Sequence, residues 1–376
     1  VLSIEPDSQL ALQLSRSFLR LGYPSHIASA GEEGIRYLET EASPIVFLDA
    51  RLPGMSGVEI LNLLYSIQPM CQVIFLIEEP NLREIMGSIT GRIPNFLFKP
   101  LADELIEIAI RKAEQNYLLD KEKSMYLESL ERDLRIAARI QKQLSRQEKP
   151  HLDGVLFHSV TRPGKEYLNG DFCYFYQLPE NRLLIVLGDI SGSGVTAALI
   201  SREVQWLMET HYRSTATPAE LLQIINNALI DKLGNCSLSV MAGVLHTSAA
   251  EFEYCICGTP MPVLIHGDGS HQFLPHANQV IGILKDMELR SARASLSPDQ
   301  MLFVFTNGLL ELGMGQQGGG AMDEVFESVH RSLQGVTDPA TFEQEFQKLL
   351  HRLENVHLRE GFNDDIAMAV IKLLAP

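Results

Sequence analysis

Residues 101–148 contain neither proline nor glycine, and this stretch constrains the fold of the chain more than any other feature. Proline and glycine are the residues that most often end or bend a helix, so their absence here indicates one long helix. A chain of 376 residues has room for two domains. We therefore expect a domain at 1–115, a helical linker at 116–148 and a second domain at 149–376.

The linker carries side chains spaced by three and four residues, and all but one of them are apolar: Leu127, Leu130, Leu134, Ala137, Gln141 and Leu144. Such a heptad stripe needs a partner surface. One interpretation is a helix packed against its own domains. The other, which we favour, is a parallel coiled coil that makes the protein a homodimer.

The first hundred residues alternate short apolar runs with segments of helical spacing. The runs at 1–4, 44–49, 72–77 and 95–98 read as buried strands, and 8–21 reads as a helix between two of them. Strands that alternate with helices predict an α/β doubly wound domain around a parallel five-stranded sheet.

From about Pro150 the pattern becomes rich in strands. Apolar runs occur at 182–190, 238–246, 251–258, 262–267, 300–308 and 365–374. Helical patterns occur near 193–211, 218–232 and 322–353. Long strands with a few helices predict an α+β sandwich of antiparallel sheets with flanking helices.

The composition excludes some classes of partner. Lys and Arg total 31 against 47 Asp and Glu, a formal net charge of −16, and such a charge repels a nucleic-acid backbone. The five cysteines show no zinc spacing and suit reduced thiols. No apolar run is long enough to span a membrane, and no signal peptide is visible. We expect a cytoplasmic protein without nucleic-acid or membrane partners.

Three polar residues in the first domain lie at or just beyond the ends of apolar runs. Glu5 follows the run at 1–4, Asp49 ends the run at 44–49, and Lys99 follows the run at 95–98. Parallel strands bring such ends together at one edge of the sheet. Carboxylates beside a lysine can bind Mg²⁺ and accept a phosphoryl group.

The segments LDARLPGMSGVEIL (48–61) and FKP (98–100) resemble the phosphoacceptor segment and the Lys-Pro signature of response-regulator receiver domains. The resemblance implies Asp49 as phosphoacceptor, Glu5 as ligand of one Mg²⁺ and Lys99 as phosphate partner. It also implies an upstream histidine kinase or small phosphodonor. Two positions depart from the family: Pro6 replaces an acidic residue, and Ile77 replaces the switch Thr or Ser.

Acidic and amide residues also mark strand ends in the second domain. They are Asp171, Asp189, Asn307 and the pair Asp364 and Asp365. A carboxylate at a buried strand end is costly unless something neutralises it. Mg²⁺ and Mn²⁺ prefer such oxygen ligands, so we expect a divalent metal site.

Five segments in this order resemble the SpoIIE-type branch of the protein phosphatase 2C family: NGDFCYF (169–175), GDISGSG (188–194), GTPMPVLI (258–265), TNGLLE (306–311) and DDIAMAV (364–370). The segment AARIQKQL (137–144) resembles the helix that leads into such domains. The implied mechanism is hydrolysis of a phosphoserine or phosphothreonine by water held between two Mg²⁺ or Mn²⁺ ions. The resemblance implies Asp171, Asp189 and Asp364 as catalytic residues. It implies a metal-binding set of Asp171, Asp189, the carbonyl of Ile190, Asn307, Asp364 and Asp365.

Asn307 stands where the family has a ligating aspartate, Ser193 replaces a histidine and Asn169 replaces a glycine. The amide of Asn307 offers oxygen without charge, which should weaken the binding of one ion and with it turnover. The favoured function is a receiver-controlled phosphatase acting on a phosphorylated STAS-domain anti-sigma-factor antagonist, which would set sigma-factor availability. The alternative is an inactive adaptor, similar to the RssB-like receiver proteins, that binds a sigma factor or an antagonist.

Overall fold

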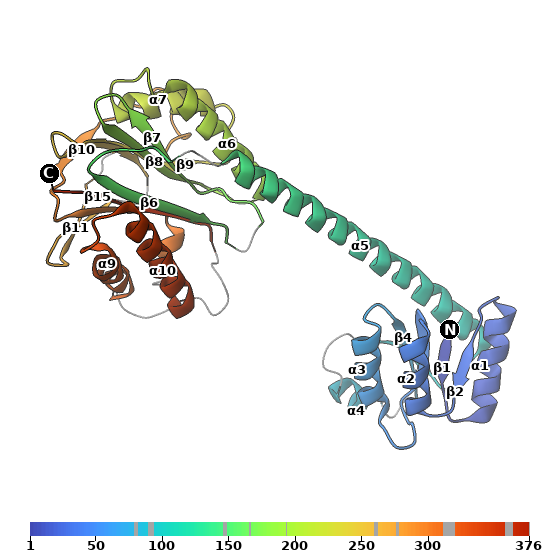
Figure 1. Ribbon diagram of the computed structural model, residues 1–376. Coiled ribbons are helices and arrows are strands. Elements are labelled where there is room, and N and C mark those ends of the chain that lie inside the picture. Colours follow the sequence, from blue (N-terminus) through green and yellow to red (C-terminus); the bar gives the residue numbers. More distant parts are fainter. Residues whose placement is uncertain are drawn as a thin grey trace. The chain divides into compact units, whose positions relative to one another are not determined.

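The chain divides into two compact units, Val1–Arg132 and Asp133–Pro376. The boundary falls inside helix α5 (Asp103–Leu144), which joins them (Figure 1). The structure is a computed structural model that describes residues 1–78, 82–88, 94–145, 149–164, 167–192, 194–258, 262–275, 278–310, 320–357 and 364–375.

The first unit contains a parallel five-stranded sheet in the order β2-β1-β3-β4-β5. Its strands are β1 (Leu2–Ile4), β2 (His26–Ala28), β3 (Ile45–Asp49), β4 (Gln72–Ile77) and β5 (Asn95–Phe98). Its other helices are α1 (Ser8–Arg20), α2 (Gly31–Thr40), α3 (Gly57–Ile67) and α4 (Leu82–Ser88). The predicted doubly wound α/β fold is confirmed.

Both faces of this sheet are covered, which explains why its strands are almost wholly apolar. Alternate residues of β3 point to opposite faces. Phe47 packs with α1 and the first turns of α5, where its ring lies 5.0 Å from that of Phe18. Leu48 packs on the other face with α2 and α3.

The second unit contains two antiparallel sheets, in the orders β13-β10-β9-β8-β7 and β12-β11-β14-β15-β6. The first comprises β7 (Phe172–Leu178), β8 (Arg182–Ile190), β9 (Leu238–His246), β10 (Glu251–Cys257) and β13 (Ala292–Ser295). The second comprises β6 (Val155–Arg162), β11 (Val263–Ile265), β12 (His271–Phe273), β14 (Met301–Phe305) and β15 (Ile366–Leu373).

The two sheets stack face to face around a shared apolar core, and helices cover both outer faces (Figure 1). Helices α6 (Gly194–His211) and α7 (Pro218–Leu229) pack on the first sheet. Helices α9 (Gly320–Leu333) and α10 (Pro339–His357) pack on the second. The predicted sandwich of antiparallel sheets with flanking helices is confirmed.

The single helical stretch predicted at 322–353 is wrong, because the structure has two helices there. Gly335 and Pro339 both disfavour a continuous helix. Asp338 accepts a hydrogen bond from the backbone N–H of Thr341 at 2.8 Å and so caps the start of α10. At the end of α9, the ammonium group of Lys372 donates to the carbonyls of Gln334 and Val336.

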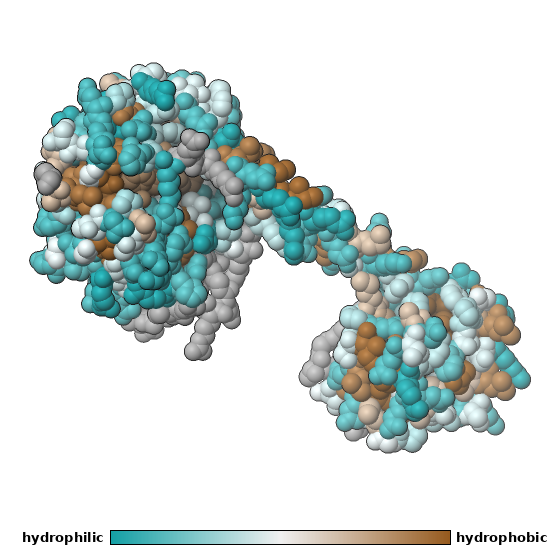
Figure 2. Space-filling view, viewed as in Figure 1, coloured by the Kyte–Doolittle hydropathy of each residue, from teal (hydrophilic) through white to brown (hydrophobic). Residues whose placement is uncertain are grey.

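Helix α5 is continuous through the predicted linker and carries exposed apolar side chains. Leu127 is 52% exposed and Leu130 is 43% exposed, whereas Leu134 and Ala137 are half-buried. Figure 2 shows apolar surface along the C-terminal part of this helix. Within the described ranges, every helix is too short or too polar to cross a membrane.

Candidate metal site in the sandwich

The predicted acidic residues lie at one edge of the two stacked sheets. Asp171 directly precedes β7 and Asp189 is the penultimate residue of β8. The register that pairs Phe172 with Gly188 places these two aspartates opposite one another. Asn307 follows β14, and Asp365 directly precedes β15, the neighbour of β14. The sandwich therefore brings together residues that are far apart in the sequence.

Asp171 is the most buried of these side chains, with 5% of its surface exposed. Burial, together with the charge of Asp189, raises the pKa of Asp171 to about 9. The hydroxyl group of Thr306 donates a hydrogen bond to Asp171 Oδ2 at 2.5 Å. In the chain alone, this carboxyl group is therefore protonated at neutral pH.

Asp189 completes a carboxyl pair with Asp171. Its pKa is also raised, first by burial and then by the charges of Asp364 and Asp365, while hydrogen bonds with Asp171 and Asn307 act in the opposite direction. The hydrogen bond between the two carboxyl groups raises the pKa of Asp171 and lowers that of Asp189. A bound cation would offset the repulsion between the two carboxylate charges.

Asp365 lies beside the pair, but its carboxylate is already engaged with the backbone. Oδ1 accepts the N–H of Gly164 at 2.8 Å and Oδ2 accepts the N–H of Gly170 at 2.6 Å. Asp365 thus fixes the loop that leads to Asp171. Asp364 is exposed, and its side chain accepts the backbone N–H of Asp365 at 2.9 Å.

The turn after Asp189 is held by serine side chains. Ser191 N–H donates to the carbonyl of Ser237 at 2.8 Å, and Ser237 N–H donates to Ser191 Oγ at 2.6 Å. Gly192 has a φ of 108°, a conformation that glycine adopts without strain. Ser193 lies outside the described residues.

The residues present fit a divalent cation by the chemistry of their donors. Four groups here offer hard oxygen ligands: the carboxyl groups of buried Asp171 and half-buried Asp189, the carbonyl of Ile190 and the amide of Asn307. Among the residues that the structure describes, no three Asp, Glu, His or Cys side chains are arranged to hold an ion. The fit therefore rests on the acidic pair and on neutral oxygens around it.

The sequence did not reveal the residues that support this site. Thr306 is fully buried and donates to Asp171, and Asn169 Oδ1 accepts the N–H of Asp171 at 2.8 Å. Thr306 could have been suspected from the sequence, because its hydroxyl group lies next to Asn307 at the end of an apolar run. The side chain of Gln141, from α5, bonds the backbone of Asn169.

In the first unit, the three predicted residues do converge. Lys99 Nζ lies 2.9 Å from Glu5 Oε2 and 2.8 Å from Asp49 Oδ2. Burial raises the pKa of Glu5. Burial alone would lower the pKa of Lys99, but its hydrogen bonds to Asp49 and Glu5 raise it.

The two departures in the receiver-like segment have visible consequences. Asp7 cannot stand in for the acidic residue lost at Pro6, because its carboxylate caps α1 by accepting the N–H groups of Gln9 and Leu10. Ile77 is 1% exposed and packs in the apolar core at the end of β4.

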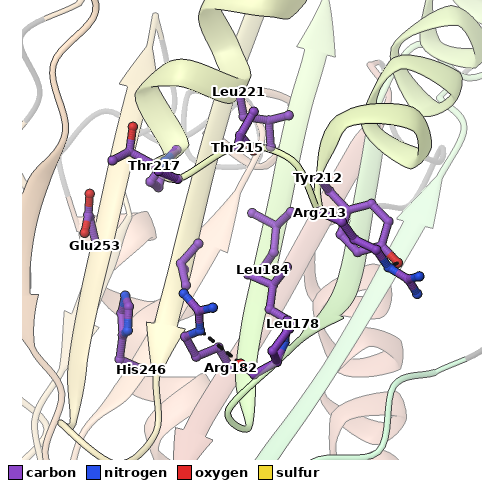
Figure 3. Close-up of a pocket in the computed structure, with 14 residues that line it drawn as sticks. Leu178, Arg182, Leu184, Tyr212, Arg213, Thr215, Thr217, Leu221, His246 and Glu253 are labelled. Carbon is purple, nitrogen blue, oxygen red and sulfur yellow. Dashed lines mark hydrogen bonds between the residues drawn. The ribbon is translucent and has the colours of Figure 1, made fainter.

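A small cavity of about 100 Å³ lies at the opposite end of β8 from Asp189. Figure 3 shows Arg182, Tyr212, Thr217, His246 and Glu253 around it. Arg182 Nε donates to the carbonyl of Pro179 at 3.0 Å, and Glu253 pairs with Arg293 at 3.0 Å. None of the predicted site residues lines this cavity.

Comparisons with known proteins agree with this architecture. The family model for "Stage II sporulation protein E (SpoIIE)" matches residues 179–374, and the model for "Response regulator receiver domain" matches residues 1–111. The phosphoserine phosphatase RsbP of Bacillus subtilis (strain 168) is 28% identical over 188 residues, which are 48% of this chain and 45% of RsbP. The chain thus spans less than half the length of that relative.

Two further relatives extend the similarity. The phosphoserine phosphatase RsbU of Bacillus subtilis (strain 168) is 21% identical over 235 residues, 61% of this chain and 68% of RsbU. The solved SiaA-PP2C domain of Pseudomonas aeruginosa has a TM-score of 0.54 and 18% identity, covers 66% of this chain and 98% of that domain, and shares the fold. Because the SpoIIE model matches just over half of the residues, the chain belongs to the SpoIIE family and carries a receiver domain at its N-terminal end.

Proposed function

We propose that this protein is a response regulator whose output is metal-dependent dephosphorylation of a phosphoserine or phosphothreonine protein. The observation that carries the proposal is the pair formed by buried Asp171 and half-buried Asp189 at facing strand ends, whose pKa values are both raised. Such a pair is costly in an empty site and is relieved by a divalent cation. Membership of the SpoIIE family supports the same conclusion.

When bound, Mg²⁺ or Mn²⁺ would lower the pKa of a water molecule so that hydroxide is available near neutral pH. Asp189, Asp171 and the carbonyl of Ile190 would hold the metal. Thr306 and Asn169 orient Asp171, and Asp365 holds the loop before it. Asp364, at the exposed rim, would be the remaining acidic ligand, and Asn307 would add a neutral oxygen.

The substrate in this proposal is a phosphorylated STAS-domain antagonist of an anti-sigma factor, whose dephosphorylation sets sigma-factor availability in the cytoplasm. Support comes from two relatives, RsbP and RsbU, whose names state that they are phosphoserine phosphatases. Phosphate release from a phosphorylated STAS protein should depend on Mn²⁺ and should be lost in Asp189→Ala. Equal inactivity of both proteins at saturating Mn²⁺ would contradict the proposal.

A second function is an adaptor that binds a sigma factor or an antagonist without turnover. Asn307 favours this alternative, because its amide supplies no charge where the family has a carboxylate. A stable complex that forms equally well with EDTA or Mn²⁺, together with no phosphate release, would select the adaptor.

The input in this proposal is phosphorylation of Asp49 by a histidine kinase or a small phosphodonor. The hydrogen bond from Lys99 to Asp49, and the position of Glu5 beside them, support it. Acetyl phosphate with Mg²⁺ should label the full chain and should not label Asp49→Ala. If the full chain takes up no label, regulation by phosphorylation of Asp49 is excluded.

A further inference from the structure

The loop at 278–290, between β12 and β13, exposes two adjacent apolar side chains. Ile283 is 62% exposed and Leu284 is 49% exposed. A single exposed apolar residue is ordinary on a protein surface. Adjacent ones in an ordered loop more often mark a surface that another molecule covers.

The part of the loop that carries these side chains is held from below by one asparagine. Asn226 of α7 is fully buried. Its Oδ1 accepts the N–H of Gly282 at 3.0 Å, and its Nδ2 donates to the carbonyl of Leu284 at 3.0 Å. Ile283 therefore lies between two fixed backbone positions, and its side chain is presented to solvent without being free to collapse onto the core.

The base of the loop is held in the same way. Asn278 Oδ1 accepts the N–H of Arg290 at 2.9 Å, and Asn278 Nδ2 donates to the carbonyl of Arg290 at 3.0 Å. Gly282 has a φ of 92°, and a Cβ atom there would lie 2.2 Å from Leu233 Cδ1, so only glycine lets the loop pack this closely. A loop that is fixed in advance loses little conformational entropy when a partner binds.

The loop stands beside the proposed metal site. Ile281 and Leu238 form an antiparallel bridge, in which each N–H donates to the carbonyl of the other residue, at 3.0 and 3.1 Å. On its other side Leu238 pairs with Ile190, the residue after Asp189. Because neighbouring strands lie about 4.8 Å apart, the backbone of Ile281 is about 10 Å from that of Ile190.

We propose that Ile283 and Leu284 form a docking surface for the folded phosphoprotein substrate. The inference rests on the proposed phosphatase function. A stable interface covers about 800 Å² of each partner, so it reaches roughly 16 Å from its centre. An interface centred on a phosphoserine at the metal site would therefore include this loop. The substrate must present an apolar surface next to its phosphoserine, and burial of the two branched side chains supplies affinity.

The test compares two substrates of the full chain in Mn²⁺: a phosphorylated STAS-domain protein and p-nitrophenyl phosphate, an ester too small to span the distance to the loop. For each variant, kcat/KM for the protein is divided by kcat/KM for the ester. In the double variant Ile283→Ser, Leu284→Ser this ratio should fall about 10–100-fold, mainly through KM for the protein.

Two control variants accompany the double variant. Leu19→Ser should keep the wild-type ratio, because Leu19 is 78% exposed but lies in the first unit. Ile283→Leu should also keep it, because an apolar side chain of equal size remains. Titration calorimetry in EDTA, which stops turnover, should show a matching rise in the dissociation constant for the phosphoprotein in the double variant alone.

A wild-type ratio and wild-type affinity in the double variant overturn the inference while the proposed function stands. A double variant whose mass in light scattering halves, at unchanged affinity for the phosphoprotein, also overturns it and assigns the loop to an interface between copies of the chain. If the wild-type chain binds the phosphoprotein through these residues but releases no phosphate, only the proposed function is contradicted. A wild-type chain that neither binds nor dephosphorylates the protein contradicts both.

Discussion

At the scale of a single residue, Asn307 should limit the metal affinity of the site, because it has an amide nitrogen in place of a second carboxylate oxygen. It follows β14 and hydrogen-bonds Asp189, yet it contributes no charge to offset that of a divalent ion. We expect Asn307→Asp to tighten Mn²⁺ binding at least tenfold and to raise phosphatase activity, measured by calorimetry and phosphate release. Asn62→Asp, an exposed change of equal charge in the receiver unit, is the control. Unchanged Mn²⁺ affinity in Asn307→Asp would show that residue 307 does not contact the metal.

The raised pKa of Asp171 makes the stability of the metal-free protein depend on pH. Its carboxyl group titrates near pH 9 in the folded chain and near pH 4 when unfolded. Between these values the folded state binds more protons, so stability falls as pH rises. Thermal unfolding in EDTA should therefore show a lower midpoint at pH 8.5 than at pH 6. In Asp171→Asn this difference should shrink; a difference of unchanged size would place the titrating group elsewhere.

At the scale of elements, the heptad stripe on α5 includes the exposed apolar side chains of Leu127 and Leu130. If the helix forms a coiled-coil homodimer, Leu127→Arg should halve the mass measured by light scattering at micromolar concentration. Leu118→Arg is the matched control, because Leu118 is 57% exposed on the opposite side of the helix. If the wild-type chain is a monomer, the dimer prediction is wrong, and the stripe packs against the protein's own domains instead.

The elements that the sequence predicted well are those with long apolar runs. The runs at 182–190 and 238–246 coincide with β8 and β9, since both strands are buried over nearly their whole length. Strand β6 was missed because it mixes apolar residues with His158 and Ser159. His158 is nonetheless buried, where Lys149 and Gln347 bond its ring nitrogens. Partners so distant in sequence cannot be predicted from local pattern.

The ligand candidates of the metal site could also be predicted from local sequence pattern. Residues such as Asp189 and Asn307 stand at strand ends beside glycine, a pattern visible in the sequence. The supporting contacts depend on tertiary structure. Thr306 reaches Asp171 across 135 positions of sequence, and Gly164 reaches Asp365 across 201. Only the fold reveals that Asp365 holds a loop.

At the scale of the whole molecule, the chain is two compact units that share one helix. Separate cores predict two thermal transitions, and Mn²⁺ should raise the one that belongs to Asp133–Pro376 by about 5–10 °C at a hundredfold excess over the dissociation constant of its site. Scanning calorimetry with Mn²⁺ and with EDTA measures this. One transition that shifts as a whole would show that the units unfold together.

The proposed domain limits at residues 115 and 148 can be checked on the same protein. Limited proteolysis should cut within 116–148 before it cuts either sheet, because exposed linkers open more readily than packed strands. Early cleavage inside β8 or β9 would contradict these limits.

The pairing of β6 with β15 also determines which unit can fold first during synthesis. These strands, at 155–162 and 366–373, lie at opposite ends of the second unit and pair along their full length. The last strand of the receiver sheet ends at residue 98, so the receiver can fold while the second unit is still being synthesised. The second unit must wait for its last strand, which also brings Asp365 to Gly164 and Gly170. A growing chain would thus carry a finished receiver long before the metal site of its second unit could form.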